Sequence, residues 1–208
     1  MPDWSTIYER LTARIESYGI AVRAQRLGLE TTGVFDGHSI TTNTDYDLET
    51  RSHNIAHAFG HIAQWSLQYD RFRALYDQLY AAKATRRTDP VALEQALGRF
   101  REYEEEASQH AAWLLLETGC PDALPAFILF ARADIEAIVG FHRDDIAPVW
   151  RTFFEAFQGR VARGEWQLRP FEPKPVPPFV PVRLEPQEVI QEVDGQAGPA
   201  LSGSGQGS

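Results

Sequence analysis

The chain has a single cysteine, Cys120, and a shortage of basic residues, with 20 Lys and Arg against 29 Asp and Glu and a formal net charge of -9. One cysteine cannot form an internal disulfide and cannot supply the paired cysteines of a zinc knuckle. Binding to nucleic acid needs clustered basic side chains for the phosphates. We therefore expect a protein of a reducing compartment with no nucleic-acid partner.

Long apolar runs are also missing. No stretch approaches the roughly 18 uncharged apolar residues of a membrane-spanning helix, so no membrane partner is expected. Residues 1–17 are charged and amphipathic and lack the apolar segment of a secretory signal. Together with the single cysteine, this pattern predicts a cytoplasmic protein.

What the chain does have is helical periodicity. Its 208 residues, 43% of them hydrophobic, suffice for one well-buried domain and an additional segment. Apolar spacing predicts helices over 4–18, 48–68, 69–84 and 91–117, and two more within 122–159. Alternation predicts a strand within 20–27 and a hairpin around Asp36-Gly37. The prediction is an α+β, helix-dominated domain with a small antiparallel sheet near its N-terminus.

The composition changes after residue 164. Residues 165–208 begin with closely spaced prolines, which favour extended backbone, and end in a Gly- and Ser-rich stretch with little to bury. We predict one domain over 1–164, followed by a flexible tail over 165–208.

The stretch "HNIAHAFGH", residues 53–61, places three histidines four residues apart. On a helix His53, His57 and His61 lie within about 80° of one another, with Gln64 beside them. We expect the opposite side of this helix to be buried and the histidines to follow one edge of it. The small residue Gly60 would let another element approach closely. An isolated pair of this kind is also common on solvated helices, so a further ligand is needed to indicate a metal.

A candidate third ligand lies on the helix predicted over 91–117. Glu104 falls in the middle of an apolar stripe, where a carboxylate is costly unless a cation or a hydrogen-bond donor neutralises it. Two imidazoles one helical turn apart and a carboxylate from another helix form a typical zinc site, with a fourth position left for water. Glu106 is the second candidate, although Glu106 and His110 have the spacing of an ordinary surface pair.

The chain resembles the ImmA/IrrE family of small zinc metallopeptidases. The family pattern is a hairpin, a helix with "LAHELGH" and a later helix reading roughly "ExxANxFAxxLL". This sequence has "HSITTNTDYDLETRSHNIAHAFGH" and then "EEEASQHAAWLLL", in the same order and with comparable spacing. The resemblance covers residues 4–117 and implies a zincin-like fold with zinc held by His57, His61 and Glu104. Ser108 and His110 replace the asparagine and the phenylalanine of the pattern.

One departure affects the chemistry directly. Ala58 stands where the family has its general-base glutamate, which accepts the proton of the zinc-bound water. Proton transfer of this kind contributes typically about 10²–10⁴-fold to the rate. His53, or His38 on the hairpin, could approach the metal instead, His53 either as a fourth ligand or as a substitute base. An engineered replacement of the glutamate would also explain Ala58.

Three hypotheses follow. The first is a zincin-fold protein that retains zinc but not peptidase activity and either binds a protein or peptide partner or acts as a regulatory or structural module. The second is an active metallopeptidase or other metallohydrolase that uses another base or carries an engineered change. In the third, the histidines and Glu104 form a metal-free polar cluster in a helical binding protein. The sequence does not define the oligomeric state.

Overall fold

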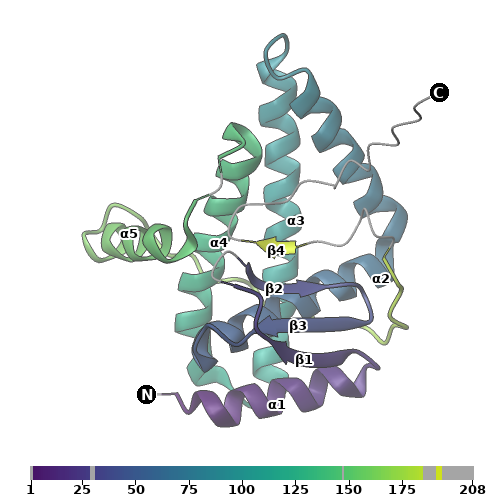
Figure 1. Ribbon diagram of the computed structural model, residues 1–208, viewed down its shortest axis with the longest axis vertical. Helices are drawn as coiled ribbons and strands as arrows, with labels where there is room; N and C mark the ends of the chain where they lie inside the picture. The colour runs from purple at the N-terminus through teal and green to yellow at the C-terminus, as the bar shows by residue number, and fades with distance from the viewer. Residues whose placement is uncertain (1, 29–30, 147, 185–190, 194–208) are drawn as a thin grey trace, which may run out of the picture.

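The computed structural model describes residues 2–28, 31–146, 148–184 and 191–193, and helices form most of it (Figure 1). The helices are α1 (Trp4–Ser17), α2 (Leu48–Ala84), α3 (Pro90–Glu117), α4 (Leu124–Asp144) and α5 (Trp150–Ala162), with the short 3-10 turn η1 (Pro121–Ala123). The strands are β1 (Ala21–Gln25), β2 (Thr31–Phe35), β3 (Ser39–Asn43) and β4 (Gln191–Val193). The predicted helix-dominated α+β class is confirmed.

Local signals account for the helix boundaries. The Asp3 carboxylate accepts hydrogen bonds from the first turn of α1, and Asp47 does the same for α2. Asp89 caps α3, whose first residue is Pro90. The helices predicted over 48–68 and 69–84 form the single element α2, which is interrupted at Gln68 by a non-helical backbone (φ -146°, ψ 46°). Beyond this kink α2 rises away from the sheet beside α3 (Figure 1).

The hairpin around Asp36-Gly37 forms as predicted. The Asp36 carboxylate accepts hydrogen bonds from the backbone N–H groups of His38 (3.0 Å) and Ser39 (2.6 Å). Gly37 has φ +83°, a left-handed conformation that glycine adopts at no steric cost. The turn therefore fixes how β2 and β3 pair.

The sheet is mixed rather than wholly antiparallel. Its strand order is β1-β3-β2-β4, with β2 antiparallel to both β3 and β4. The predicted antiparallel arrangement is wrong for β1, which pairs with β3 in parallel, from Ala21 opposite Ser39 to Gln25 opposite Asn43. The reason is topological: β2 lies beyond β3, so β3 returns between β1 and β2 and runs in the direction of β1.

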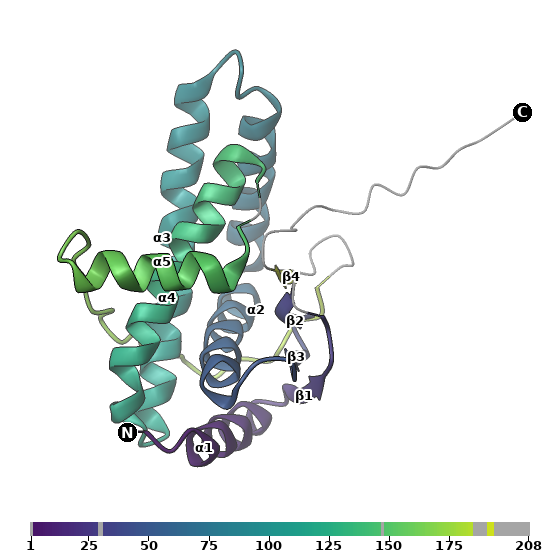
Figure 2. The same cartoon turned by 60° about the vertical axis from the view of Figure 1, so that its left-hand side comes forward.

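Helix α2 is the centre of the domain. One side of it faces the sheet, and the other sides face α1, α3 and α4 (Figure 2). All residues from Ser52 to Trp65 are buried. The expectation that the histidines follow an edge of a half-buried helix is therefore wrong, because this stretch of α2 is covered on every side.

The segment after α5 extends the packed structure beyond the predicted domain end at residue 164. Phe171, Val176 and Leu184 are each 3–6% exposed and belong to the hydrophobic core. A Cβ placed on Gly37 would lie 1.9 Å from the carbonyl oxygen of Val182, so the hairpin turn and this segment pack closely. The predicted flexible tail is wrong for residues 165–184 and for residues 191–193, which form β4, while residues 185–190 and 194–208 lie outside the described residues.

Within the described ranges, no helix combines the length and the apolar character needed to cross a membrane. The cytoplasmic location stays a prediction.

Candidate metal centre

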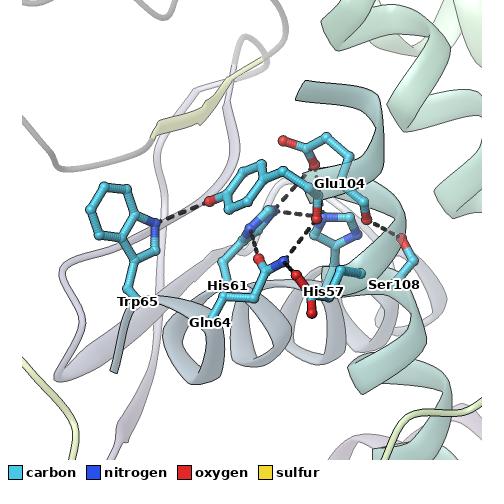
Figure 3. A network of polar contacts seen from close by, with 8 residues as sticks. His57, His61, Gln64, Trp65, Glu104 and Ser108 are labelled. Carbon is cyan, nitrogen blue, oxygen red and sulfur yellow. Dashed lines mark hydrogen bonds and ion pairs between the residues drawn. The ribbon is translucent and has the colours of Figure 1, made fainter. Parts of the chain in front are cut away.

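The candidate site forms where α2 and α3 cross at very short range. A Cβ placed on Gly60 would lie 2.2 Å from the backbone carbonyl oxygen of Ala107, a distance that no real side chain tolerates. Glycine at this position therefore lets the two helix backbones approach. One turn before Ala107, Glu104 then faces His57 and His61 across the crossing, as Figure 3 shows.

Three ligand atoms converge in this crossing. His57 Nε2 lies 2.8 Å from His61 Nε2 and 3.3 Å from Glu104 Oε2, and His61 Nε2 lies 3.2 Å from the same oxygen. All three residues are buried, at 1–2% exposure. They form the one group of metal-ligand type found among the described residues, and such a group could hold a metal ion. The structure thus brings together the three residues that the sequence pointed to.

The tautomer of His61 follows from its neighbour Gln64. The Gln64 amide Nε2 donates to the carbonyl oxygen of Tyr103 (2.9 Å), so Gln64 Oε1 is the atom that faces His61 Nδ1 at 3.1 Å. Because Oε1 can only accept, His61 Nδ1 carries the proton and donates. The lone pair of His61 is therefore on Nε2, which points at His57 and Glu104 (Figure 3).

The electrostatic state of Glu104 fits a cation site. Burial by itself raises the pKa of this carboxyl, but the adjacent imidazoles of His61 and His57 outweigh burial and lower the pKa to about 2. Glu104 is thus an ionised carboxylate at neutral pH. A buried carboxylate is stable only when it is neutralised by hydrogen-bond donors or positive charge.

Aromatic rings form two walls of the site. Phe35 of β2 stacks on the His61 ring, with a centroid distance of 5.6 Å and an interplanar angle of 8°. Tyr103 covers the same imidazole at 4.7 Å, and its hydroxyl accepts a hydrogen bond from Trp65 Nε1 (3.0 Å). These contacts hold the His61 ring in one orientation. Sequence reasoning missed both rings, because an aromatic residue at helix or strand spacing looks the same whether it lines a site or fills a core.

The donor set and its spacing fit a tetrahedral divalent ion. Bond lengths of roughly 2.0–2.1 Å to imidazole nitrogen and carboxylate oxygen place two tetrahedral ligand atoms about 3.3 Å apart. Two of the three separations, 3.2 and 3.3 Å, have this value, and the third is 2.8 Å. His57 Nδ1 is buried and has no hydrogen-bond partner among the described residues. The second ring nitrogen of His57 thus lacks the outer partner that Gln64 provides for His61.

His53 does not join this group. Its ring packs among Trp4, Phe127 and Phe130, at centroid distances of 5.0, 6.0 and 5.1 Å. Burial lowers the pKa of His53 to about 3, so the ring is neutral. The structure therefore places His53 neither as a fourth donor nor as a base beside the three ligand atoms.

The remaining candidates also lie outside the group of three. Glu106 forms ion pairs with Lys174 and with Arg71 (3.3 Å), and His110 Nδ1 donates to the backbone carbonyl oxygen of Lys174 (2.9 Å). His38 is exposed on the hairpin turn. Glu106 nevertheless contacts Gln64, the residue that orients His61, through a hydrogen bond of 3.3 Å.

The position at which the family resemblance would place a general base is apolar. Ala58 is 1% exposed and belongs to the hydrophobic core. Its methyl group can neither accept nor donate a proton. The second acidic candidate, Glu106, forms ion pairs with Arg71 and Lys174 and accepts a hydrogen bond from Gln64.

No family model, no curated protein and no solved structure matches this chain. The resemblance to the ImmA/IrrE family stays a prediction that rests on the quoted motifs.

Proposed function

We propose that this protein binds a divalent metal ion, zinc by the preference of its donors, through His57 Nε2, His61 Nε2 and Glu104 Oε2. The observation that carries the proposal is the convergence of these three buried atoms within 3.3 Å of one another. Two imidazoles and one carboxylate are a common donor set for zinc. With this set the ion would join α2 to α3 at their crossing.

A metal-free cluster accounts less well for the same contacts. With the His61 proton on Nδ1, only His57 Nε2 can contribute a proton to the space between the three atoms. That proton can complete a hydrogen bond to His61 or to Glu104, and in either case the 3.2 Å contact between His61 Nε2 and Glu104 Oε2 brings together two atoms that can only accept. A cation satisfies all three lone pairs at once.

We further propose that the module does not hydrolyse peptides but binds a protein or peptide partner or regulates one. Ala58 removes the residue that would transfer the proton of a metal-bound water, and hydrolysis without it is expected to be slower by about 10²–10⁴-fold. The burial of the three ligand side chains supports the same conclusion, because a scissile peptide would have to reach them.

Metal analysis of the purified protein tests the binding proposal. After zinc loading and dialysis, the parent should retain close to one zinc ion per chain. His57→Ala, His61→Ala and Glu104→Ala should each lose it, while His53→Phe and His110→Phe should retain it. Unfolding curves of the metal-free proteins separate loss of binding from loss of folding. A folded parent without metal would overturn the proposal.

A hydrolase is the second candidate, and one observation favours it. The site offers three protein donors and so leaves a fourth position for water, as catalytic zinc sites do. Zinc-dependent cleavage of a peptide library by the parent, lost in His57→Ala, would establish this alternative and overturn the non-catalytic proposal. Ala58→Glu tests the engineered version, in which cleavage appears only in that variant.

A further inference from the structure

The segment after α5 crosses the outside of α3 close to the metal centre. Lys174 is fixed there by its backbone: its N–H donates to the carbonyl oxygen of Gln109 (3.1 Å), and its own carbonyl accepts from His110 Nδ1 (2.9 Å). These two bonds hold Lys174 against the helix that carries Glu104. The backbone of Lys174 is thus fixed independently of the ion pair that its side chain makes with Glu106.

Further contacts hold the same segment on both sides of Lys174. Before it, Phe171 is buried against Phe127 and lies beneath the Arg132 guanidinium, 4.0 Å from the ring centroid. After it, the N–H of Val182 donates to the Ser66 hydroxyl (3.3 Å) on α2, and the N–H of Leu184 donates to the carbonyl of Asp36 (3.1 Å) in the hairpin.

A line of polar contacts leads from Lys174 to a metal ligand. The Lys174 ammonium pairs with Glu106 Oε1, and Glu106 Oε2 accepts from Gln64 Nε2 (3.3 Å). The same Gln64 amino group also donates a hydrogen bond to the carbonyl oxygen of Tyr103 (2.9 Å). Gln64 Oε1 then accepts from His61 Nδ1 (3.1 Å). Arg71 also reaches Glu106 Oε2, at 3.3 Å, from the solvent side.

The orientation of the Gln64 amide decides whether His61 can bind a metal. With the amide as described, two acceptors face its amino group and its oxygen faces His61. Turned by 180°, it would present an N–H to His61 Nδ1, which would shift the imidazole proton to Nε2 and remove the lone pair needed for a metal. Glu106 is one of the two acceptors that disfavour the turned amide, and Lys174 holds Glu106 in place.

We infer that Lys174 and Glu106 are positioning residues of the metal centre, which act on His61 through Gln64, so that the segment 170–184 is a functional part of the site. The inference rests on the proposed metal binding. Outer hydrogen-bond partners of metal-ligating histidines typically contribute about 10–100-fold to metal affinity. In this protein such a partner is stabilised by a residue 110 positions further along the chain than Gln64.

The test is a double-mutant cycle on zinc affinity, measured by competition with a chromophoric chelator. Gln64→Leu should weaken zinc binding roughly 10–100-fold. Lys174→Met, which keeps the backbone bonds, should weaken it roughly twofold to fivefold, the range of a half-exposed ion pair. In the Gln64→Leu background, Lys174→Met should have no further effect, because its influence passes through Gln64. Lys174→Arg and the exposed change Glu172→Gln are the matched controls and should bind like the parent.

A second measurement does not depend on metal. Nitrogen-15 NMR of the metal-free parent should show the His61 proton on Nδ1, and Gln64→Leu should shift the proton toward Nε2. A parent with the His61 proton on Nε2 overturns the inference. The inference is also overturned if Lys174→Met lowers the zinc affinity equally in the parent and in Gln64→Leu, or does not lower it at all. In these cases the proposed function still stands as long as the parent binds zinc. A parent that binds no zinc overturns the proposed function, and the positioning role with it.

Discussion

His53 and His61 lie two helical turns apart on the same side of α2, and both are almost fully buried, yet their surroundings are opposite. His61 contacts a carboxylate, an imidazole and an amide. His53 is enclosed by aromatic rings, and its Nε2 has no partner among the described residues. The four-residue repeat is the same for both. What differs is the element across from each histidine, so the facing surface, rather than the spacing, determines which histidines join the candidate metal centre.

Exchanging the two histidines for phenylalanine should give the largest contrast. His61→Phe removes a ligand and is expected to weaken zinc binding by more than about 100-fold, beyond the effect of losing an outer partner. His53→Phe should leave the zinc affinity unchanged, because no ligand atom contacts its ring. Chelator competition on both variants provides the measurement. An equal loss of zinc affinity in the two variants would show that His53 and His61 belong to one site.

The close helix crossing can be tested with two helical glycines, of which only Gly60 lies against the backbone of another helix. Gly60→Ala places a methyl group against the Ala107 backbone and should lower the free energy of unfolding by about 1–3 kcal/mol, as overpacking does. Gly98 in α3 has no atom within 4 Å of an added Cβ. Gly98→Ala should therefore raise the free energy of unfolding by about 0.5–1 kcal/mol.

Chemical denaturation of both glycine variants and zinc titration of each check this prediction. Zinc affinity should fall in Gly60→Ala, because α3 and Glu104 are displaced, and should be unchanged in Gly98→Ala. A stable Gly60→Ala variant with unchanged affinity would contradict the close crossing.

Acid should lower the stability of the folded protein through His53. Burial lowers the pKa of His53 to about 3, well below the ordinary value of about 6.5 for a histidine. As the pH falls below about 6.5, the unfolded chain binds a proton at this residue and the folded chain does not, so stability is lost progressively down to about pH 3. At about pH 5 the loss amounts to roughly 2 kcal/mol.

The variant His53→Phe should remove this part of the acid sensitivity, which unfolding curves at neutral pH and at about pH 5 measure. His142 shares the same range of pH, because burial and Lys83 lower its pKa to about 4, so some sensitivity should remain. An unchanged pH dependence in His53→Phe would show that His53 is not buried as a neutral ring.

Local features of the chain were predictable from sequence. The Asp36-Gly37 turn and the apolar stripe around Glu104 depend on neighbouring residues, and the structure contains both. The close approach at Gly60 was also expected, because a small residue beside the histidines lets another element approach closely. The resemblance to the motif "LAHELGH" also predicted that His57 and His61, rather than His53, lie next to Glu104.

Features that depend on distant parts of the chain were not predictable. The parallel pairing of β1 with β3 requires knowing that β2 lies beyond β3. The proline-rich composition after residue 164 is the same for a solvated segment and for one packed on a domain. Only the apolar side chains of Phe171, Val176 and Leu184 among the prolines could have indicated contact with a core. With that segment assigned as flexible, Lys174 could not be connected with the metal centre.

The contact between the hairpin and the segment 170–184 also bears on how the protein is made. Asp36 near the start of the chain accepts a hydrogen bond from Leu184, and β2 is flanked by β4. During synthesis the hairpin leaves the ribosome well before these partners exist, so these contacts can form only after residue 184 and residues 191–193 have been translated. A chain stopped after Gly164 would keep all three candidate ligands and lack the residues that cover Phe127 and the hairpin turn.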